Sequence, residues 1–381
     1  MFIYLLFISL LLVCHLIQPR VNSKKLELLA IPLVAIFLCM GYMTGSDWRG
    51  YELHYSELYF EDVFSGRYEP GFTLYQSIFR FWGIPFFVYN IISKLITFGV
   101  FYSIIKGFSP KYRYLCLMYY TCVSGYAVFI DYSMRNVMAV TIAMCSLKYY
   151  ANRQMWKWMA ASLLAVSFHT TAIIMFPLYF VRLANVKSKY ILIVFVLFNI
   201  IMMAVQDSFF EKVNFLANIS EHAAAKYEHY ATGIDDYSSG KGLSLGYLFN
   251  VSIFLLILKF RKEIVSTYKY GEMLFVFAIL HTFFYRIGLS VTIFGRFELY
   301  FSLIHCVAFA CCINFIRIKL RRQIVLIIVF LFSLMSTYVT VTSNTKFVPY
   351  TNYLFHLNDN LNYNQRDNYN YINSPYKNKQ E

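Results

Sequence analysis

An acid-rich segment early in the chain carries residue types that could transfer a proton. Asp47 and Glu69 bracket this segment at its two ends, next to apolar runs. A carboxylate at the edge of a membrane is poorly hydrated, which raises its pKa toward that of a general base. Trp48, Tyr51 and Tyr55 follow the first of these acids, and the two tyrosines, one helical turn apart, are typical of an interfacial aromatic belt.

Three further motifs supply cations and a histidine from distant parts of the chain. Arg135 opens a predicted helix, and His169 lies in the polar sequence F-H-T-T-A. Arg296 lies in G-R-F-E-L-Y, one loop after Arg286. A guanidinium matches the geometry of phosphate and carboxylate oxygens. A single histidine at a helix break is also common for structural reasons, so the role of His169 stays open between chemistry and structure.

Lys94 lies near the middle of the apolar segment 84–105, with Asn90 one helical turn before it. Ionisable residues inside a membrane are costly and usually mark a functional site. The Lys94 side chain is therefore expected either to bind an anionic group of a substrate or lipid, or to form a structural ion pair.

Membrane helices must position these residues. Of the 381 residues, 59% are hydrophobic and 14% are charged, whereas soluble domains are about 45–50% apolar and about 25% charged. Backbone groups in lipid must be satisfied within their own segment, so the apolar runs are predicted to be helices. The predicted fold class is all-α, a polytopic integral membrane protein with about 10–12 transmembrane helices. The apolar segments are 2–17, 28–44, 84–105, 114–130, 134–150, 155–181, 190–206, 243–258, 271–288, 297–315 and 323–340.

Basic residues at the helix ends orient these segments. The formal net charge is +14, which in a soluble protein would suggest nucleic-acid binding. The basic residues cluster instead at segment ends, and such clusters stay on the cytoplasmic side. The clusters lie near residues 20–25, 106–113, 148–157, 182–189, 259–269 and 317–322.

The segment 155–181 has basic clusters at both ends, so both ends are predicted to be cytoplasmic. The polar break at 167–171 then predicts two short helices that meet near His169 as a re-entrant hairpin. The alternative is a single span with one misassigned basic loop. With the hairpin, the predicted external residues include Asp47, Glu69, Arg135, His169, Arg286 and Arg296.

The predicted organisation is a single transmembrane domain over 1–340 with a polar, mobile tail over 341–381. Its long external loops are 45–70 and 207–242, and the second is expected to hold an amphipathic helix on the membrane. The eight cysteines lie in apolar runs without a C-x-x-C pair, so no metal site is predicted. The adjacent acids Glu61-Asp62 leave a divalent metal open.

Together these motifs resemble the EpsG-like group of Wzy-type polysaccharide polymerases over roughly residues 40–300. Two departures from the group's pattern are Asn136, where Gln is usual, and Thr171, where Ser is commoner before Ala. The matching motifs are Asp47 with Tyr51 and Tyr55, Glu69-Pro70-Gly71-Phe72, Arg135, His169-Thr170-Thr171-Ala172 and Arg296-Phe297.

The resemblance implies an enzyme of the bacterial inner membrane with its active face in the periplasm. Such an enzyme transfers an undecaprenyl-pyrophosphate-linked glycan chain onto an incoming lipid-linked repeat unit, without a cofactor. A GT-C-like architecture is compatible with it. The expected partners are the lipid-linked oligosaccharides, the bilayer, a chain-length regulator and a flippase, with no nucleic acid.

The resemblance also implies roles for individual residues. The catalytic base is Asp47 or Glu69, with His169 as the rival. The leaving pyrophosphate is bound by Arg135 and Arg296, supported by Arg286 and Lys94, and sugar faces stack on Trp48, Tyr51 and Tyr55. Three other activities stay open: a lipid-linked oligosaccharide flippase, a membrane O-acyltransferase and an O-antigen ligase.

The hairpin makes a testable prediction about topology. A reporter inserted in the 182–189 loop of the full-length chain should show cytoplasmic activity, because that loop carries a basic cluster. An external signal would contradict the hairpin and every external assignment that follows it.

Overall fold

The computed structural model describes all residues except 65–66, 206–243, 291–293, 360 and 374–381. Within the described ranges the chain is helical and has no strand, only an isolated antiparallel bridge between Gly41 and Asn352. The predicted all-α class is therefore confirmed. The amphipathic helix expected within 207–242 lies outside the described residues.

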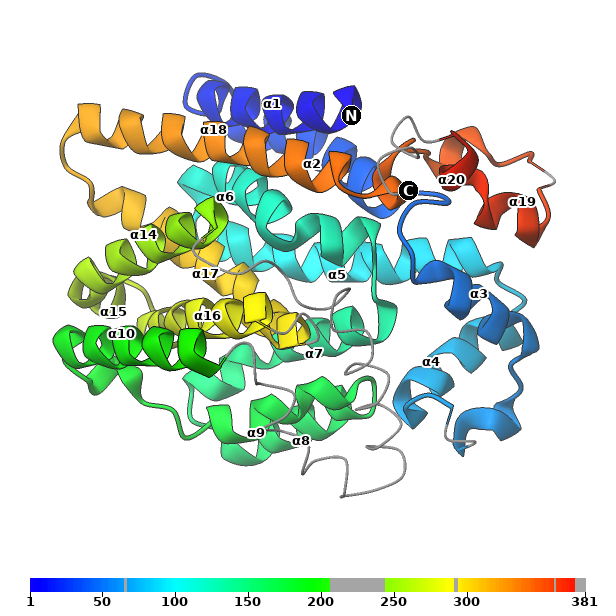
Figure 1. Ribbon diagram of the computed structural model, residues 1–381, viewed down its shortest axis with the longest axis horizontal. Helices are drawn as coiled ribbons and strands as arrows, with labels where there is room; N and C mark the ends of the chain where they lie inside the picture. The colour runs from blue at the N-terminus through cyan, green and yellow to red at the C-terminus, as the bar shows by residue number, and fades with distance from the viewer. Residues whose placement is uncertain (65–66, 206–243, 291–293, 360, 374–381) are drawn as a thin grey trace. The chain divides into compact units, whose positions relative to one another are not determined.

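The chain divides into two compact units, which are described separately (Figure 1). Unit 1 comprises Met1–Tyr179 and Phe309–Glu381. Its α-helices are α1 (Phe2–Ile17), α2 (Ser23–Cys39), α3 (Trp48–Glu57), α4 (Pro70–Phe81), α5 (Phe86–Phe108), α6 (Arg113–Tyr120), α7 (Met134–Ala151), α8 (Met155–Val166), α9 (Met175–Leu178), α18 (Lys319–Thr342), α19 (Tyr363–Asp367) and α20 (Tyr369–Asn373). Short 3₁₀ helices are η1 (Phe60–Phe64), η2 (Pro110–Tyr112), η4 (Thr170–Ile174), η9 (Thr345–Phe347) and η10 (Tyr353–Phe355), and η3 (Thr121–Ile130) is a π-helix.

Unit 2 comprises Phe180–Ala308. Its elements are η5 (Leu183–Asn185), α10 (Ser188–Val205), α14 (Leu245–Lys259), α15 (Arg261–Thr267), α16 (Gly271–Ser290) and the first part of α17 (Gly295–Phe315). The helix α16 contacts α10, α14, α15 and η5, so it forms the centre of this unit.

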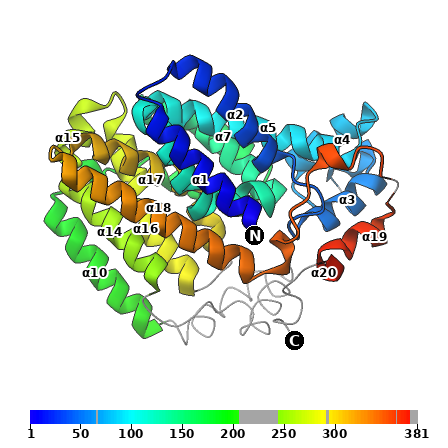
Figure 2. The ribbon, with the colours of Figure 1, turned by 90° about the horizontal axis from the view of Figure 1, so that it is seen from above.

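The helix α6 forms the centre of unit 1. All of its residues are buried, and it packs against α1, α5 and α18. Figures 1 and 2 show α1 and α18 side by side. A helix that is covered on every side must be apolar or aromatic all round, as the sequence from Tyr114 to Tyr120 is. The buried Arg113 at its start pairs with Glu27 at 3.2 Å and donates to the Ser23 carbonyl.

Four described helices are long and apolar enough to cross a membrane by length and composition: α5, α16, α17 and α18. The helices α1, α8, α10 and α14 are apolar but shorter. Of the other predicted spans, α2 is a continuous helix of 17 residues that contains Pro32, and α6 continues as the π-helix η3. The structure therefore fits a membrane-embedded polytopic protein.

The segment 155–181 folds as a broken hairpin. The helix α8 forms one arm, and η4 and α9 return beside it. Trp158 Nε1 donates to the Met175 carbonyl at 2.7 Å, and the Tyr179 hydroxyl donates to the Arg153 carbonyl at 2.9 Å. The two arms are therefore antiparallel neighbours, and the break in the helix occurs where the sequence predicts it.

The C-terminal segment contacts unit 1 beside α3 (Figure 2). Arg366 pairs with Glu52 at 2.5 Å, and Arg49 pairs with Asp367. The Tyr363 ring lies 6.3 Å from Trp48. The sequence predicts mobility for this segment, yet its described part makes specific polar contacts with α3.

Candidate active site

The Glu69 carboxylate joins three segments of unit 1. Its Oε2 accepts a hydrogen bond from Arg135 Nη1 at 2.8 Å. Its Oε1 lies 3.0 Å from His169 Nδ1 and accepts from the Thr170 backbone N–H at 3.2 Å. Glu69 immediately precedes α4, Arg135 lies in the first turn of α7, and His169 lies at the break after α8. Three of the predicted site residues are thus in direct contact.

Arg135 also contacts two tyrosines. Its Nε donates to the Tyr51 hydroxyl at 3.3 Å, and its guanidinium carbon lies 4.4 Å from the centre of the Tyr68 ring. Stacking of a guanidinium on an aromatic face fixes its plane. The Arg135 side chain keeps 25% of its surface exposed, against 14% for Glu69 and 8% for His169, so Arg135 is the most accessible of the three.

Backbone contacts hold the segments around Glu69 in register. The Gly71 and Phe72 N–H groups donate to the Ser167 carbonyl at 2.8 and 3.1 Å. A Cβ at Gly71 would overlap Ser167 Oγ, so only glycine allows this close approach. Thr171 Oγ1 donates to Asn136 Oδ1 at 2.8 Å. The two residues that depart from the family pattern therefore hydrogen-bond to each other.

The ionisation of Glu69 differs from the sequence-based expectation. Burial alone would raise its pKa, but the His169 hydrogen bond, the charge of Arg135 and a backbone N–H lower it to about 2. The expected rise toward a general base is therefore wrong for Glu69. A carboxylate that stays ionised and accepts from a histidine is suited to orient that histidine.

Asp47 lies at the start of α3, one helical turn before Tyr51. Its Oδ1 accepts from Ser46 Oγ at 3.3 Å. Its charge helps to raise the pKa of the Tyr51 phenol, although burial is the larger cause and Arg135 opposes both. Asp47 thus belongs to the surroundings of Arg135 and acts on them through its charge.

The three predicted sugar-stacking rings are covered by protein. Trp48, Tyr51 and Tyr55 are about 5–6% exposed, and Tyr55 stacks on Tyr89 at 5.2 Å. These rings pack against other side chains, and their role in binding sugars stays a prediction. Tyr68, which the sequence places directly before Glu69, is less buried and was missed as a site residue.

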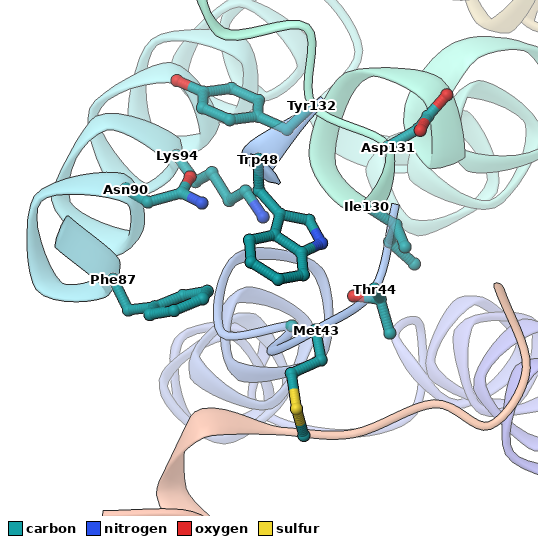
Figure 3. A pocket seen from close by; sticks show the side chains of 10 residues that line it. Met43, Thr44, Trp48, Phe87, Asn90, Lys94, Ile130, Asp131 and Tyr132 are labelled. Carbon is teal, nitrogen blue, oxygen red and sulfur yellow. The ribbon is translucent and has the colours of Figure 1, made fainter. Parts of the chain in front are cut away.

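Lys94 lies away from these contacts, in a small cavity beside Trp48 (Figure 3). Its side chain is 2% exposed, and its ammonium lies 5.1 Å from the centre of the Tyr132 ring. The cavity has room for a body the size of one water molecule. This space is too small for a pyrophosphate group.

Arg286 and Arg296 belong to unit 2. Arg286 is buried in α16, donates to Ser290 Oγ at 3.0 Å and lies 5.9 Å from the Tyr247 ring. Arg296 lies exposed in the first turn of α17. Unit 2 therefore holds one predicted arginine in its interior and the other on its surface.

Unit 2 also holds ionisable groups that the sequence reasoning left without a role. Glu298, in the same motif as Arg296, lies 3.1 Å from His281 Nε2. The His281 ring stacks on His305 at 4.1 Å. These groups lie in α16 and α17, which are long enough to span a membrane. The sequence could have pointed to these groups, because charged and polar residues within apolar helices often mark a functional site.

No group of three or more His, Cys, Asp or Glu side chains in the described ranges could hold a metal ion. In the pair Glu61-Asp62, Asp62 Oδ2 instead accepts from the Tyr59 backbone N–H at 2.7 Å. The possibility of a divalent metal stays untested.

The motifs suggested a family for this chain, and a comparison with known families tests that suggestion. The sequence model of the EpsG family matches residues 24–352. The chain belongs to the EpsG family. This membership makes it a polysaccharide-related membrane protein. The match covers every predicted site residue and ends before α19, so the ion pairs between α19 and α3 lie partly outside the EpsG region. No curated protein and no solved structure matched the chain.

The close contact at Gly71 can be tested by substitution. Gly71→Ala should lower the stability by about 1–3 kcal/mol, because the added methyl group overlaps Ser167. Thermal unfolding of the purified full-length protein in detergent would measure this. Gly50→Ala in α3 is the matched control, since no atom lies within 4 Å of its added Cβ. Equal stability of the two variants would contradict the assigned contact.

The lowered pKa of Glu69 predicts a pH dependence. The unfolded carboxyl titrates near its ordinary 4.5 and the folded one near 2, so the pairing stabilises the fold above pH 4.5. That contribution is lost as the pH falls from 4.5 toward 2. The destabilisation caused by Glu69→Gln should therefore shrink over this range in thermal unfolding.

Glu57→Gln is the control, because Glu57 forms only an exposed ion pair with Arg67 at 3.6 Å, which contributes little. A Glu69→Gln effect that grew on acidification would contradict the lowered pKa.

Proposed function

We propose that the protein is a polysaccharide polymerase. It transfers a glycan chain from undecaprenyl pyrophosphate to a hydroxyl of an incoming lipid-linked repeat unit, at the periplasmic face of the inner membrane. The contact of Glu69 with His169 and Arg135 carries this proposal, because it combines a histidine, its orienting carboxylate and an accessible cation. EpsG-family membership supports the substrate class.

His169 is the general base in this proposal. A neutral imidazole that donates from Nδ1 to Glu69 carries its lone pair on Nε2. Nε2 takes the proton of the acceptor hydroxyl while that oxygen attacks the anomeric carbon. The bond from the anomeric carbon to the pyrophosphate oxygen breaks, and the pyrophosphate leaves with its electrons. Such general-base help is worth about 10²–10⁴-fold in rate.

Arg135 stabilises the leaving pyrophosphate. A guanidinium has five N–H donors, and the bonds to Glu69 and Tyr51 engage two of them. Its partial exposure and its stacking on Tyr68 give a fixed cation that a substrate can reach. A fixed charge costs little reorganisation when negative charge develops. Arg296 and Arg286 are proposed to bind pyrophosphate as well, and for them the proposal rests on the family motif and their positive charge.

Two further roles follow from exposure and charge. The less buried Tyr68, in place of Trp48, Tyr51 and Tyr55, is the proposed ring for a sugar face. Asp47 is the alternative base, since a carboxylate near Tyr51 could also receive the hydroxyl proton.

Separate alanine substitutions at Arg135, His169 and Arg296 test the proposal. Each should remove long polymer when expressed in a strain that lacks the native gene, because each removes a base or a cation from the reaction. The measurement is the length ladder of the surface polysaccharide, with membrane expression confirmed by immunoblot. Asp47→Asn should retain a ladder if His169 is the base.

His356→Ala is the matched control histidine, since His356 pairs with Asp359 in the C-terminal segment. A normal ladder in the Arg135 or His169 variant would overturn the proposed site. A deletion strain that keeps single repeat units on its lipid anchor supports a polymerase, whereas loss of every repeat unit would indicate a flippase or a ligase.

A further inference from the structure

Lys94 lies in a cavity that the proposed reaction does not use (Figure 3). The walls come from the loop before α3, the first residue of α3, the helix α5, and the end of η3 with the two residues that follow it, all within unit 1. The cavity leaves about 10 Å³ for the centre of a water-sized body, which is room for one such body.

The charges around this cavity do not balance. Asp131 on its wall already accepts from Lys346 Nζ at 2.6 Å and from the Ser46 backbone N–H and hydroxyl at 2.8 Å. Figure 3 shows the Asp131 carboxylate pointing away from Lys94. In the described ranges no carboxylate oxygen lies within 4.0 Å of the Lys94 ammonium. The one carboxylate on the wall is therefore paired with Lys346, and Lys94 has no ion-pair partner among the described residues. An uncompensated buried cation is costly.

The other polar atoms of the wall are suited to donate hydrogen bonds. The Thr44 hydroxyl, the Trp48 indole N–H and the Asn90 Oδ1 are buried without a hydrogen-bond partner among the described residues. Hydroxyl and indole groups donate, and the Asn90 amide can present its NH₂ instead of its oxygen by turning over. These three residues and Lys94 are each at least nine-tenths buried.

We propose that this cavity binds one monovalent anion of the size of chloride. The Lys94 ammonium supplies the charge, and Thr44 and Trp48 supply neutral donors. A monatomic anion is only slightly larger than water, so it needs much less space than a phosphate. The anion neutralises Lys94 and satisfies the orphaned donors, which a water molecule could do only in part.

The site is connected to the proposed active site through the chain itself. Trp48 is the first residue of α3 and directly follows Asp47. An anion bound to the Trp48 indole N–H would fix the start of α3, and with it Asp47 and Tyr51. Occupancy should therefore stabilise the fold, with the effect depending on Lys94.

Thermal unfolding of the purified full-length protein in sodium chloride and in sodium gluconate at equal ionic strength tests the proposal. Chloride should raise the midpoint by a few degrees in a saturable way, because a ligand of the folded state stabilises it. Lys94→Met should abolish the difference between the salts while remaining folded, since an apolar side chain often replaces a buried charge without loss. Thr44→Val should raise the chloride concentration needed for half of the effect.

Lys106→Met is the matched control in the same helix, because Lys106 is half-exposed and pairs with Glu27 at 2.6 Å. It should keep the full chloride response. Bromide in the cavity, seen as an anomalous scattering peak beside Lys94, would support the site independently of any variant. Equal midpoints in the two salts, or an unchanged chloride response in Lys94→Met, would overturn the proposal and leave water as the occupant.

Discussion

The Glu69 carboxylate sits where water is scarce and must find its hydrogen-bond donors within the protein. It obtains them from Arg135, His169 and the Thr170 amide, which belong to two other segments. Breaking one contact would leave a largely covered charge partly unsatisfied, which is costly. The starts of α4 and α7 and the end of α8 are therefore held together around Glu69. The hydrogen bonds of Gly71 and Asn136 connect the same three segments.

This constraint also divides the chemical work. Because Glu69 remains ionised, it is better suited to hold a histidine in one orientation than to accept a proton itself. Arg135 is anchored by Glu69 and by the Tyr68 ring but retains exposed surface. The arrangement thus separates an orienting acid, a candidate base and a cation, each from a different motif.

The sequence predicted the fold class and the helix break well, because both depend on local composition. The polar residues Ser167-Phe168-His169-Thr170-Thr171 interrupt a long apolar run and so mark the favoured place for a break. It also singled out Glu69, Arg135 and His169, which the structure brings into contact, since charged and polar groups beside membrane helices are few. It could not predict which face of α3 is covered, and it therefore assigned Trp48 and Tyr55 to the stacking of sugar rings. Burial of those rings depends on tertiary contacts with Tyr363 and Tyr89, which no local pattern encodes.

The contacts of the C-terminal segment with α3 affect how the protein should be engineered. Arg366 and Asp367 bind Glu52 and Arg49, so a late segment of the chain helps to hold an early one. Serial truncations fused to a reporter, a common way to map membrane topology, would lose these ion pairs in every shortened chain. Insertions into surface loops keep both partners. A purification tag should be added after residue 373, so that Arg366 and Asp367 are kept. Replacing the polar tail with a tag would remove both residues.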